Sequence, residues 1–142
     1  MPKAVIDINI ILASIGLNSP YRWIIDCIYE GKLILFVSND ILFEYLEVLE
    51  SKTSIAFSRN FIDFIVANPN IKKIDIYYNF LIITRDMDDN KYVDCAVTCN
   101  ADCLVSNDSH FKVLKDITFP KVNHLTLKQF EAKYKKQLTG KI

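Results

Sequence analysis

Glycine and proline are scarce in this sequence of 142 residues, which has three glycines and four prolines. Flexible linkers and collagen-like repeats contain many more of both, so neither is expected. Long hydrophobic runs are also missing. The longest apolar stretches are shorter than the roughly 20 residues that cross a bilayer, and residues 1–7 lack the pattern of a secretory signal. These absences predict a soluble, cytoplasmic protein with no membrane partner.

Net charge is absent too, because 17 basic side chains balance 17 acidic ones. This argues against a protein that binds nucleic acid through bulk charge. The distribution is uneven, however: residues 112–142 carry eight lysines and two acids, whereas residues 1–111 carry 9 basic and 15 acidic side chains. A solvated helix face is the better explanation for the lysines alone, whereas the asymmetry along the chain favours a polyanionic partner.

The spacing of the four cysteines does not favour a zinc site. Cys95, Cys99 and Cys103 are four residues apart, but zinc ligands usually come in closer pairs or with a downstream pair of histidines. Cys95 and Cys99 also lie in an apolar helical pattern. We therefore expect buried, unpaired cysteines, since a cytosolic location disfavours disulfides.

Hydrophobic residues make up 51% of the chain, which is enough for one core over residues 1–142. Short apolar runs alternate with helical patterns, and this predicts an α/β domain with a parallel sheet. Strands are expected at residues 3–7, 33–37, 71–76, 102–106 and 122–125. Helices are expected at residues 19–30, 39–50, 57–67, 89–100 and 109–115, and from residue 126 onwards. Asp88 is expected to cap the fourth of these helices, and residues 77–87 show no clear pattern.

Four acids stand at positions where a parallel sheet would bring them together. Asp7 and Asp108 follow predicted strands, and open α/β sheets bind ligands beyond the carboxyl ends of their strands. Glu44 and Asp94 lie near the starts of helices, which begin at that same edge. Each acid alone has an ordinary explanation, such as a turn former or a helix cap. The four together favour a shared crevice.

Carboxylates gathered without basic partners cannot all remain ionised, because their mutual repulsion raises their pKa values. A divalent cation removes this conflict, and carboxylate and water oxygens suit Mg²⁺ or Mn²⁺. Two such ions about 4 Å apart activate water and stabilise the leaving oxygen of a phosphodiester. The acids therefore predict metal-dependent hydrolysis of phosphodiesters. No histidine is needed as a base, and His110 is expected to be a surface residue.

The segments that carry these acids resemble the PIN-domain family over nearly the whole chain. Residues 5–9, Val-Ile-Asp-Ile-Asn, are similar to the family's hydrophobic-Asp-Thr-Asn opening, and residues 38–45 resemble the segment with its second acid. Residues 86–96 are similar to the Asp-Pro-Asp-Asp-Asn-Lys segment of a bacterial branch described as toxin components of toxin–antitoxin systems. Residues 101–111 resemble the closing strand and acid. Ile8 replaces the family's Thr, and Met87 replaces its Pro.

The resemblance implies a three-layer α/β/α fold with a central parallel sheet of about five strands. It also implies cleavage of single-stranded RNA with Mg²⁺ or Mn²⁺, assembly into a homodimer or higher oligomer, and an antitoxin protein as a partner. It assigns catalysis and metal binding to four acids, Asp7, Glu44, Asp94 and Asp108, with Asp89 as an additional metal ligand. Behind them, Asn9 and Ser106 would orient ligands or water.

Two other functions remain open on the sequence. A receiver-type phosphoacceptor domain would use Asp7 with Ser106 and Lys121, but no acidic pair adjoins Asp7 and no acceptor aspartate follows the middle strand. A PIN-like fold kept as a nucleic-acid or protein binding module, with catalysis weakened, is compatible with Ile8. Phosphorylation by a small phosphodonor without RNA cleavage would indicate the first. RNA binding that survives Asp7→Asn without metal would indicate the second.

Overall fold

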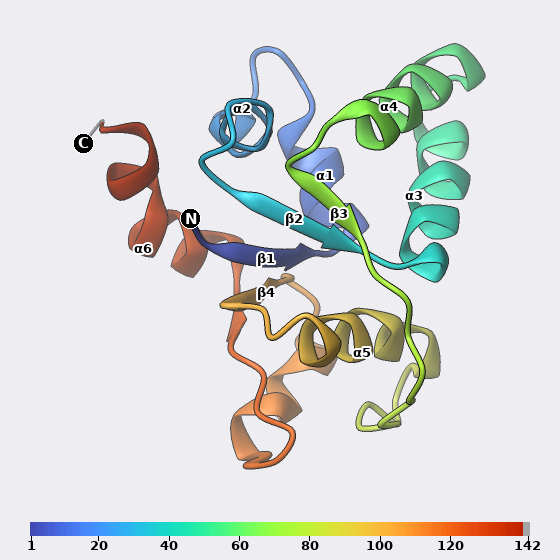
Figure 1. Cartoon of the computed structure of the whole chain (residues 1–142), viewed down its shortest axis with the longest axis vertical. Coiled ribbons are helices and arrows are strands. Elements are labelled where there is room, and N and C mark those ends of the chain that lie inside the picture. The colour runs from blue at the N-terminus through green and yellow to red at the C-terminus, as the bar shows by residue number, and fades with distance from the viewer. Residues whose placement is uncertain (141–142) are drawn as a thin grey trace.

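Five short parallel strands form the centre of the molecule, in the order β3-β2-β1-β4-β5 (Figure 1). They are β1 (Lys3–Ile6), β2 (Ile34–Val37), β3 (Ile71–Lys73), β4 (Cys103–Val105) and β5 (His124–Leu125). The computed structural model describes residues 1–140. From β1 the chain adds strands first on one side and then on the other. The switch point, where ligands of such sheets bind, therefore lies between the carboxyl ends of β1 and β4.

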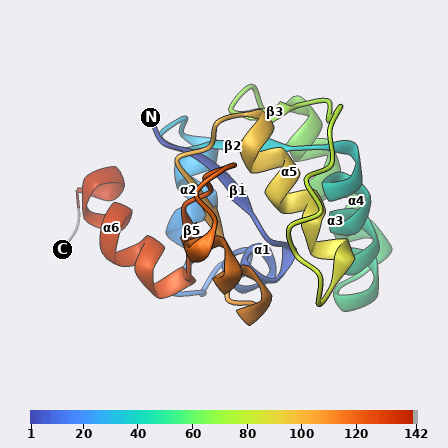
Figure 2. The same cartoon turned by 90° about the horizontal axis from the view of Figure 1, so that it is seen from below.

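Helices cover both faces of this sheet, which confirms the predicted three-layer α/β/α architecture (Figure 2). On one side α5 (Asn90–Thr98) packs on β1, β2 and β4. On the other side lie α1 (Ile8–Ser14) and α2 (Arg22–Tyr29), and α6 (Leu127–Thr139) packs on α2. At one end of the sheet α3 (Asn39–Lys52) and α4 (Ile55–Ala67) pack against each other. Two 3₁₀ helices, η1 (Met87–Asp89) and η2 (Ser109–Asp116), complete the fold.

Helix caps account for several of these boundaries. Ser38 caps α3 by accepting a hydrogen bond from the backbone N–H of Ile41, and Thr126 with Gln129 forms a capping box at the start of α6. Gly31 ends the α2 segment with a positive φ of 78°, a conformation that glycine adopts without steric cost. The caps at Ser38 and Thr126 fix where two helices begin, and Gly31 fixes where α2 ends.

Other boundaries differ from the prediction. Helix α1 was not expected at all, and α4 begins at Ile55 rather than at residue 57, because Ser54 caps it. Helix α2 begins at Arg22, three residues after Ser19. β3 ends at Lys73, and residues 74–86 then cross to η1 without regular structure. The last strand is also shorter than predicted, because β5 holds only two residues.

The expectation that Asp88 caps α5 was wrong. Asp86 caps η1 instead, since its side chain accepts a hydrogen bond from the backbone N–H of Asp88. Asp89 is the residue that precedes α5, and its side chain makes no capping hydrogen bond. The carboxylate of Asp89 is therefore available for other contacts.

The core consists of aliphatic and aromatic side chains on both faces of the sheet, with Tyr45, Tyr92, Phe111 and Phe130 among its largest fully buried members. All four cysteines are buried and unpaired, as expected. Among residues 1–140 no cysteine belongs to a group of three or more side chains that could share a metal ion. The four cysteine side chains contribute to the packing of the core.

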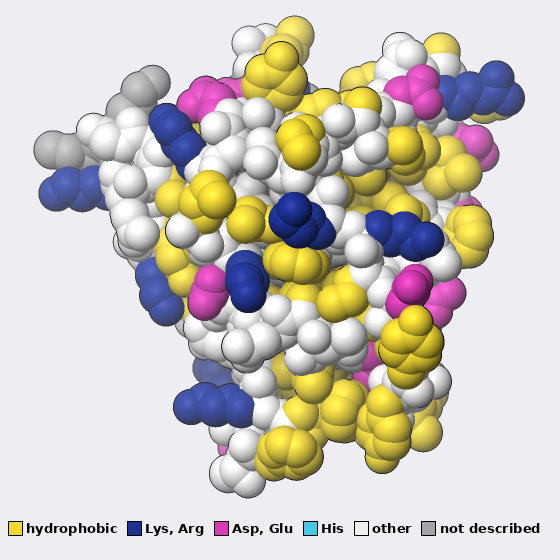
Figure 3. Space-filling view, in the orientation of Figure 1, with side chains coloured by type: hydrophobic (Ala, Val, Ile, Leu, Met, Phe, Trp, Pro, Cys, Tyr) yellow, Lys and Arg dark blue, Asp and Glu magenta, His cyan; other side chains and the backbone are white. Residues whose placement is uncertain are grey.

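The surface is uneven in its chemistry (Figure 3). Lysines lie over α6, whereas exposed hydrophobic side chains gather where residues 74–86 pass α5. The most exposed of these are Tyr77, Tyr78, Leu81 and Met87. Lys141, part of the predicted lysine-rich tail, lies outside the described residues. Within the described residues, no helix has the length and apolar character needed to cross a membrane.

Candidate metal-binding site

Asp7 lies at the switch point because it directly follows β1, whose last three residues are fully buried. Its carboxylate caps α1: Oδ1 accepts a hydrogen bond from the backbone N–H of Asn9 at 3.2 Å. Oδ2 accepts a second one from the Ser106 hydroxyl at 2.8 Å. Burial raises the pKa of Asp7 above its ordinary value, and the hydrogen bond from Ser106 offsets part of that rise.

Ser106 joins the two acids that the strands present. It follows β4, is fully buried, and donates its hydroxyl proton to Asp7 while its oxygen accepts the backbone N–H of Asp108 at 3.0 Å. Asp108 caps η2 through the backbone N–H of His110 at 2.9 Å. Asn9, in contrast, reaches Asp7 only through its backbone, and its side chain is exposed. Ser106 therefore has the geometry of a residue that orients ligands, and the side chain of Asn9 does not.

Replacement of Ser106 by Ala is expected to weaken Mn²⁺ binding about tenfold, a typical cost of losing a residue that orients metal ligands. Asp7 would lose its side-chain hydrogen bond, and the backbone N–H of Asp108 would lose its acceptor. Isothermal titration with MnCl₂ measures the change. Ser109→Ala is the matched control, because the Ser109 hydroxyl makes no hydrogen bond within residues 1–140. Equal affinities for the two variants would contradict the role given to Ser106.

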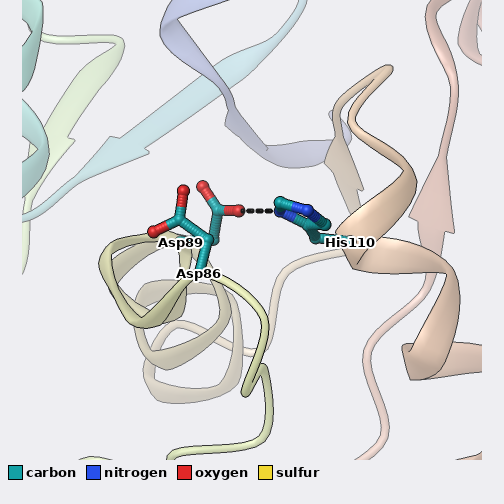
Figure 4. A group of neighbouring side chains, drawn as sticks. All are labelled: Asp86, Asp89 and His110. Atoms are coloured by element: carbon teal, nitrogen blue, oxygen red, sulfur yellow. Dashed lines mark hydrogen bonds and ion pairs between the residues drawn. The ribbon is translucent and has the colours of Figure 1, made fainter.

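Asp89 joins the same group from the opposite side, at the end of η1. The pKa of Asp89 is raised to about 6, mainly by burial, and three neighbouring carboxylates contribute: those of Asp86, Asp108 and Asp7. Contact with His110 acts in the opposite direction. Figure 4 shows the Asp86 and Asp89 side chains facing the His110 ring. Asp89 Oδ2 lies 3.1 Å from His110 Nδ1, and Asp108 Oδ1 lies 3.3 Å from the same nitrogen.

Glu44 lies next to this cluster and is held by two adjacent residues of α5. Its Oε1 accepts a hydrogen bond from the Tyr92 hydroxyl, whose oxygen in turn accepts the backbone N–H of Ile8 at 3.2 Å. Its Oε2 pairs with Lys91 Nζ at 2.9 Å, and Lys91 also pairs with Asp88 at 3.0 Å. The expectation of acids without a basic partner was therefore wrong for Glu44, because Lys91, only 12% exposed, neutralises it.

The structure does not bring Asp94 into contact with Asp7, Asp89 or Asp108. Asp94 is buried, and its Oδ1 accepts the backbone N–H of Phe80 at 3.0 Å. Burial raises the pKa of Asp94, and no neighbouring carboxylate contributes to that rise. It lines a hollow of about 520 Å³ between α3, α5 and the segment before η1, together with Glu44, Asp88 and Lys91. Asp94 therefore anchors the segment that leads into η1.

The negative charges of Asp7 and Asp108 raise the pKa of Asp89, and the charge of Asp108 raises the pKa of Asp7. Their negative charges oppose one another in a partly buried place, and Lys91, the nearest lysine in the contacts described above, is occupied by Glu44 and Asp88. Oxygen ligands of this kind fit Mg²⁺ and Mn²⁺. Among residues 1–140 one group of three possible ligands has all its donor atoms within 4.8 Å of one another, and it comprises Asp86, Asp89 and His110.

Sequence reasoning missed four contributors, His110, Asp86, Lys91 and Tyr92. His110 follows Asp108 by two residues, so its backbone N–H donates a hydrogen bond to the capping carboxylate of Asp108, and its ring is held beside the acids. That spacing was visible in the sequence, but the approach of η1 to the His110 ring was not. Ile8, which replaces a threonine in the resemblance, is buried in the core, and its substitution removes none of the acids. Lys121 of the receiver alternative is exposed and has no described contact with Asp7.

Comparisons with known proteins concern the family and the fold of the chain. A family model described as a PIN domain matches residues 3–110. Among solved structures, the chain is similar to one titled VapBC2 from Rickettsia felis bound to a DNA fragment from their promoter, with a TM-score of 0.60 and 15% sequence identity. The match covers 87% of this chain and 98% of that one. At this identity the likeness shows the fold alone. A search of curated proteins finds no match.

Proposed function

The chain belongs to the PIN-domain family, and from that premise we propose that it is a metal-dependent ribonuclease that cleaves single-stranded RNA. The observation that supports this most is the link through Ser106 between Asp7 and the backbone of Asp108 beyond the ends of β1 and β4, with Asp89 close enough for both charges to raise its pKa. A divalent ion bound there supplies an activated water and positive charge for phosphodiester hydrolysis. In this proposal Mg²⁺ or Mn²⁺ is the cofactor.

Each residue has a separate task in this proposal. Asp7, Asp89 and Asp108 hold the ion, and Ser106 orients Asp7 and Asp108. Glu44, fixed by Lys91 and Tyr92, lies at the rim of the site with its charge balanced by Lys91. Asp94, which the family resemblance assigns to the metal, is instead proposed to position the segment before η1 through the backbone of Phe80.

Single-stranded RNA is the proposed substrate because exposed aromatic rings lie beside the site. Tyr77 and Tyr78 are 90% and 66% exposed, on the segment that forms one wall of the hollow at Glu44. Unpaired bases stack on such rings, whereas the bases of a duplex are already stacked. Lys112 and Lys115 of η2 follow Asp108 closely and would contact the RNA backbone.

The direct test compares purified wild-type protein with Asp7→Asn on a labelled single-stranded RNA, with MnCl₂, with MgCl₂ and with EDTA. We expect cleavage that depends on the metal and falls at least about 100-fold in the variant, because removing charge at the metal removes transition-state stabilisation. Asp63→Asn, an exposed acid on α4, is the matched control and should cleave normally. Full activity in EDTA would contradict the proposal.

A role as the toxin of a toxin–antitoxin pair is the finer part of the proposal. It is supported by the family and by the fold shared with the VapBC2 structure. An antitoxin protein is the proposed partner, and an apolar groove of about 630 Å³ between α2 and α4 offers it a surface, with Leu17, Tyr29 and Phe57 at its exposed edge. Assembly into a homodimer stays a prediction of the family resemblance.

Induced expression of the chain in bacteria tests the toxin role. We expect growth to stop within a few generations, because uncontrolled RNA cleavage halts protein synthesis, and we expect Asp7→Asn to restore growth. Colony counts after induction provide the measurement, with protein levels compared by immunoblot. Normal growth at equal protein levels, combined with RNA cleavage in vitro, would indicate a housekeeping ribonuclease instead.

A further inference from the structure

We propose that His110 is a nitrogen ligand of the bound metal, together with Asp89, Asp108 and Asp86, and that it makes the site select Mn²⁺ over Mg²⁺. This inference rests on the proposed function, since it concerns the same metal and shares Asp89 and Asp108 with it. It differs in its content: the family resemblance assigns the metal to carboxylates, and neither His110 nor Asp86 belongs to that assignment. The positions of the donor atoms around the His110 ring support a role for His110 in metal binding.

The ring nitrogen of His110 faces carboxylate oxygens from two separate segments. Nδ1 lies 3.1 Å from Asp89 Oδ2, at the end of η1, and 3.3 Å from Asp108 Oδ1, at the start of η2. A ligand atom of Asp86 lies within 4.8 Å of both the Asp89 and the His110 ligand atoms. Figure 4 shows the contact of the ring with Asp89, and Asp86 beside it.

These separations match those between neighbouring ligands of one ion. In an octahedral shell with bonds of about 2.1–2.2 Å, adjacent ligand atoms are about 3.0 Å apart and opposite ones about 4.3 Å apart. Nδ1 of His110 has two carboxylate oxygens near the first distance and a third oxygen within reach of the second. A cation among them would need only small shifts of the side chains.

The ring is also held in place before any ion binds. The backbone N–H of His110 donates to Asp108 Oδ1, which fixes the start of η2, and the side chain is 29% exposed, so an ion can reach it from solvent. Adjacent Phe111 is fully buried and anchors the turn in the core. Preorganisation of this kind lowers the cost of assembling a metal site.

A nitrogen ligand has a defined chemical consequence. Mg²⁺ prefers oxygen ligands and retains its waters, whereas Mn²⁺, although it too favours oxygen ligands, is a transition metal and accepts an imidazole nitrogen beside them. His110 should therefore strengthen Mn²⁺ binding and leave Mg²⁺ binding nearly unchanged. Asp86, the most exposed of the group, would complete the shell from the other side of the ion.

Pulsed electron paramagnetic resonance of the Mn²⁺-loaded protein tests this directly, because it detects nitrogen bound to manganese. We expect ¹⁴N modulation in the wild type and its loss in His110→Ala. Isothermal titration should show Mn²⁺ affinity reduced about tenfold in His110→Ala and Mg²⁺ affinity changed less than about threefold. Ser109→Ala, at an exposed residue next to His110 whose hydroxyl makes no hydrogen bond within residues 1–140, is the control and should retain the modulation.

The outcomes separate this inference from the proposed function. Mn²⁺ binding that depends on Asp7, with no ¹⁴N modulation in the wild type, overturns the role of His110 and leaves the nuclease proposal standing. Equal loss of Mn²⁺ and Mg²⁺ affinity in His110→Ala also overturns it, since selectivity is then unaffected. Failure of the wild type to bind either ion overturns the proposed function itself.

Discussion

Asp89→Asn is expected to reduce metal-dependent RNA cleavage at least about 100-fold, whereas Asp94→Asn is expected to retain activity within about fivefold. Asp89 meets Asp7 and Asp108 at the switch point of the sheet, so its charge helps to hold the ion. Asp94 contacts the backbone of Phe80, and an asparagine oxygen can accept that same hydrogen bond. The measurement is the initial rate of cleavage at saturating Mn²⁺ for both variants.

Asp89→Asn should also stabilise the metal-free protein, and this stabilisation should depend on pH. Because the pKa of Asp89 is raised from 3.8 to about 6, the folded state resists ionisation of this carboxyl and loses stability as pH rises from about 4 to 6. Asparagine has no such cost. We expect metal-free Asp89→Asn to exceed the wild type by about 1 kcal/mol in unfolding free energy at pH 8, and to match it at pH 4.

Two results would count against this assignment of Asp89. One is strong loss of cleavage in Asp94→Asn with normal folding, as the sequence-based assignment predicts. The other is an Asp89→Asn protein that is no more stable than the wild type in EDTA at pH 8. Thermal unfolding in EDTA at both pH values, followed by circular dichroism, supplies the second measurement.

Tyr92→Phe is the second substitution with a large expected effect, on stability as well as on activity. The Tyr92 hydroxyl accepts the buried backbone N–H of Ile8 and donates to Glu44. Its removal leaves the N–H without an acceptor, which costs about 2 kcal/mol of unfolding free energy. Cleavage should also fall about tenfold, because Glu44 loses one of the two contacts that fix it.

Tyr134→Phe is the control for that experiment. Tyr134 is also buried, in α6, but its hydroxyl makes no hydrogen bond within the described residues. Its replacement should change the unfolding free energy by less than about 0.5 kcal/mol. Urea unfolding of both variants gives the comparison, and equal stabilities would show that the Tyr92 hydroxyl does not hold α5 to the start of α1.

Some features of this site follow from the sequence because they depend on local rules. Asp7 and Asp108 end buried strands, and parallel strands end at the same edge of the sheet, so their proximity is a consequence of topology. The caps at Ser38 and Thr126 were equally local. Helix α1 was not predictable in this way, because the short apolar run after Asp7 fits a strand and a buried helix equally well.

The sequence alone does not determine which of Asp89 and Asp94 lies near Asp7. Five residues along an α-helix turn the side-chain direction by about 500°, which leaves the two about 140° apart. Both acids therefore cannot face one crevice from the same helix. The sequence does not say which face meets β1, and the starting point of α5 after η1 decides it. The ring of His110 beside η1 depends on the same long-range packing.

The most direct test of the central claim is the position of bound manganese in crystals soaked with MnCl₂, located by anomalous scattering. The account predicts a peak within bonding distance, about 2.2 Å, of the Asp7, Asp89 and Asp108 carboxylates or of waters bound to them. A peak at Glu44 and Asp94 alone, or no peak in crystals of a protein that still cleaves RNA, would contradict it.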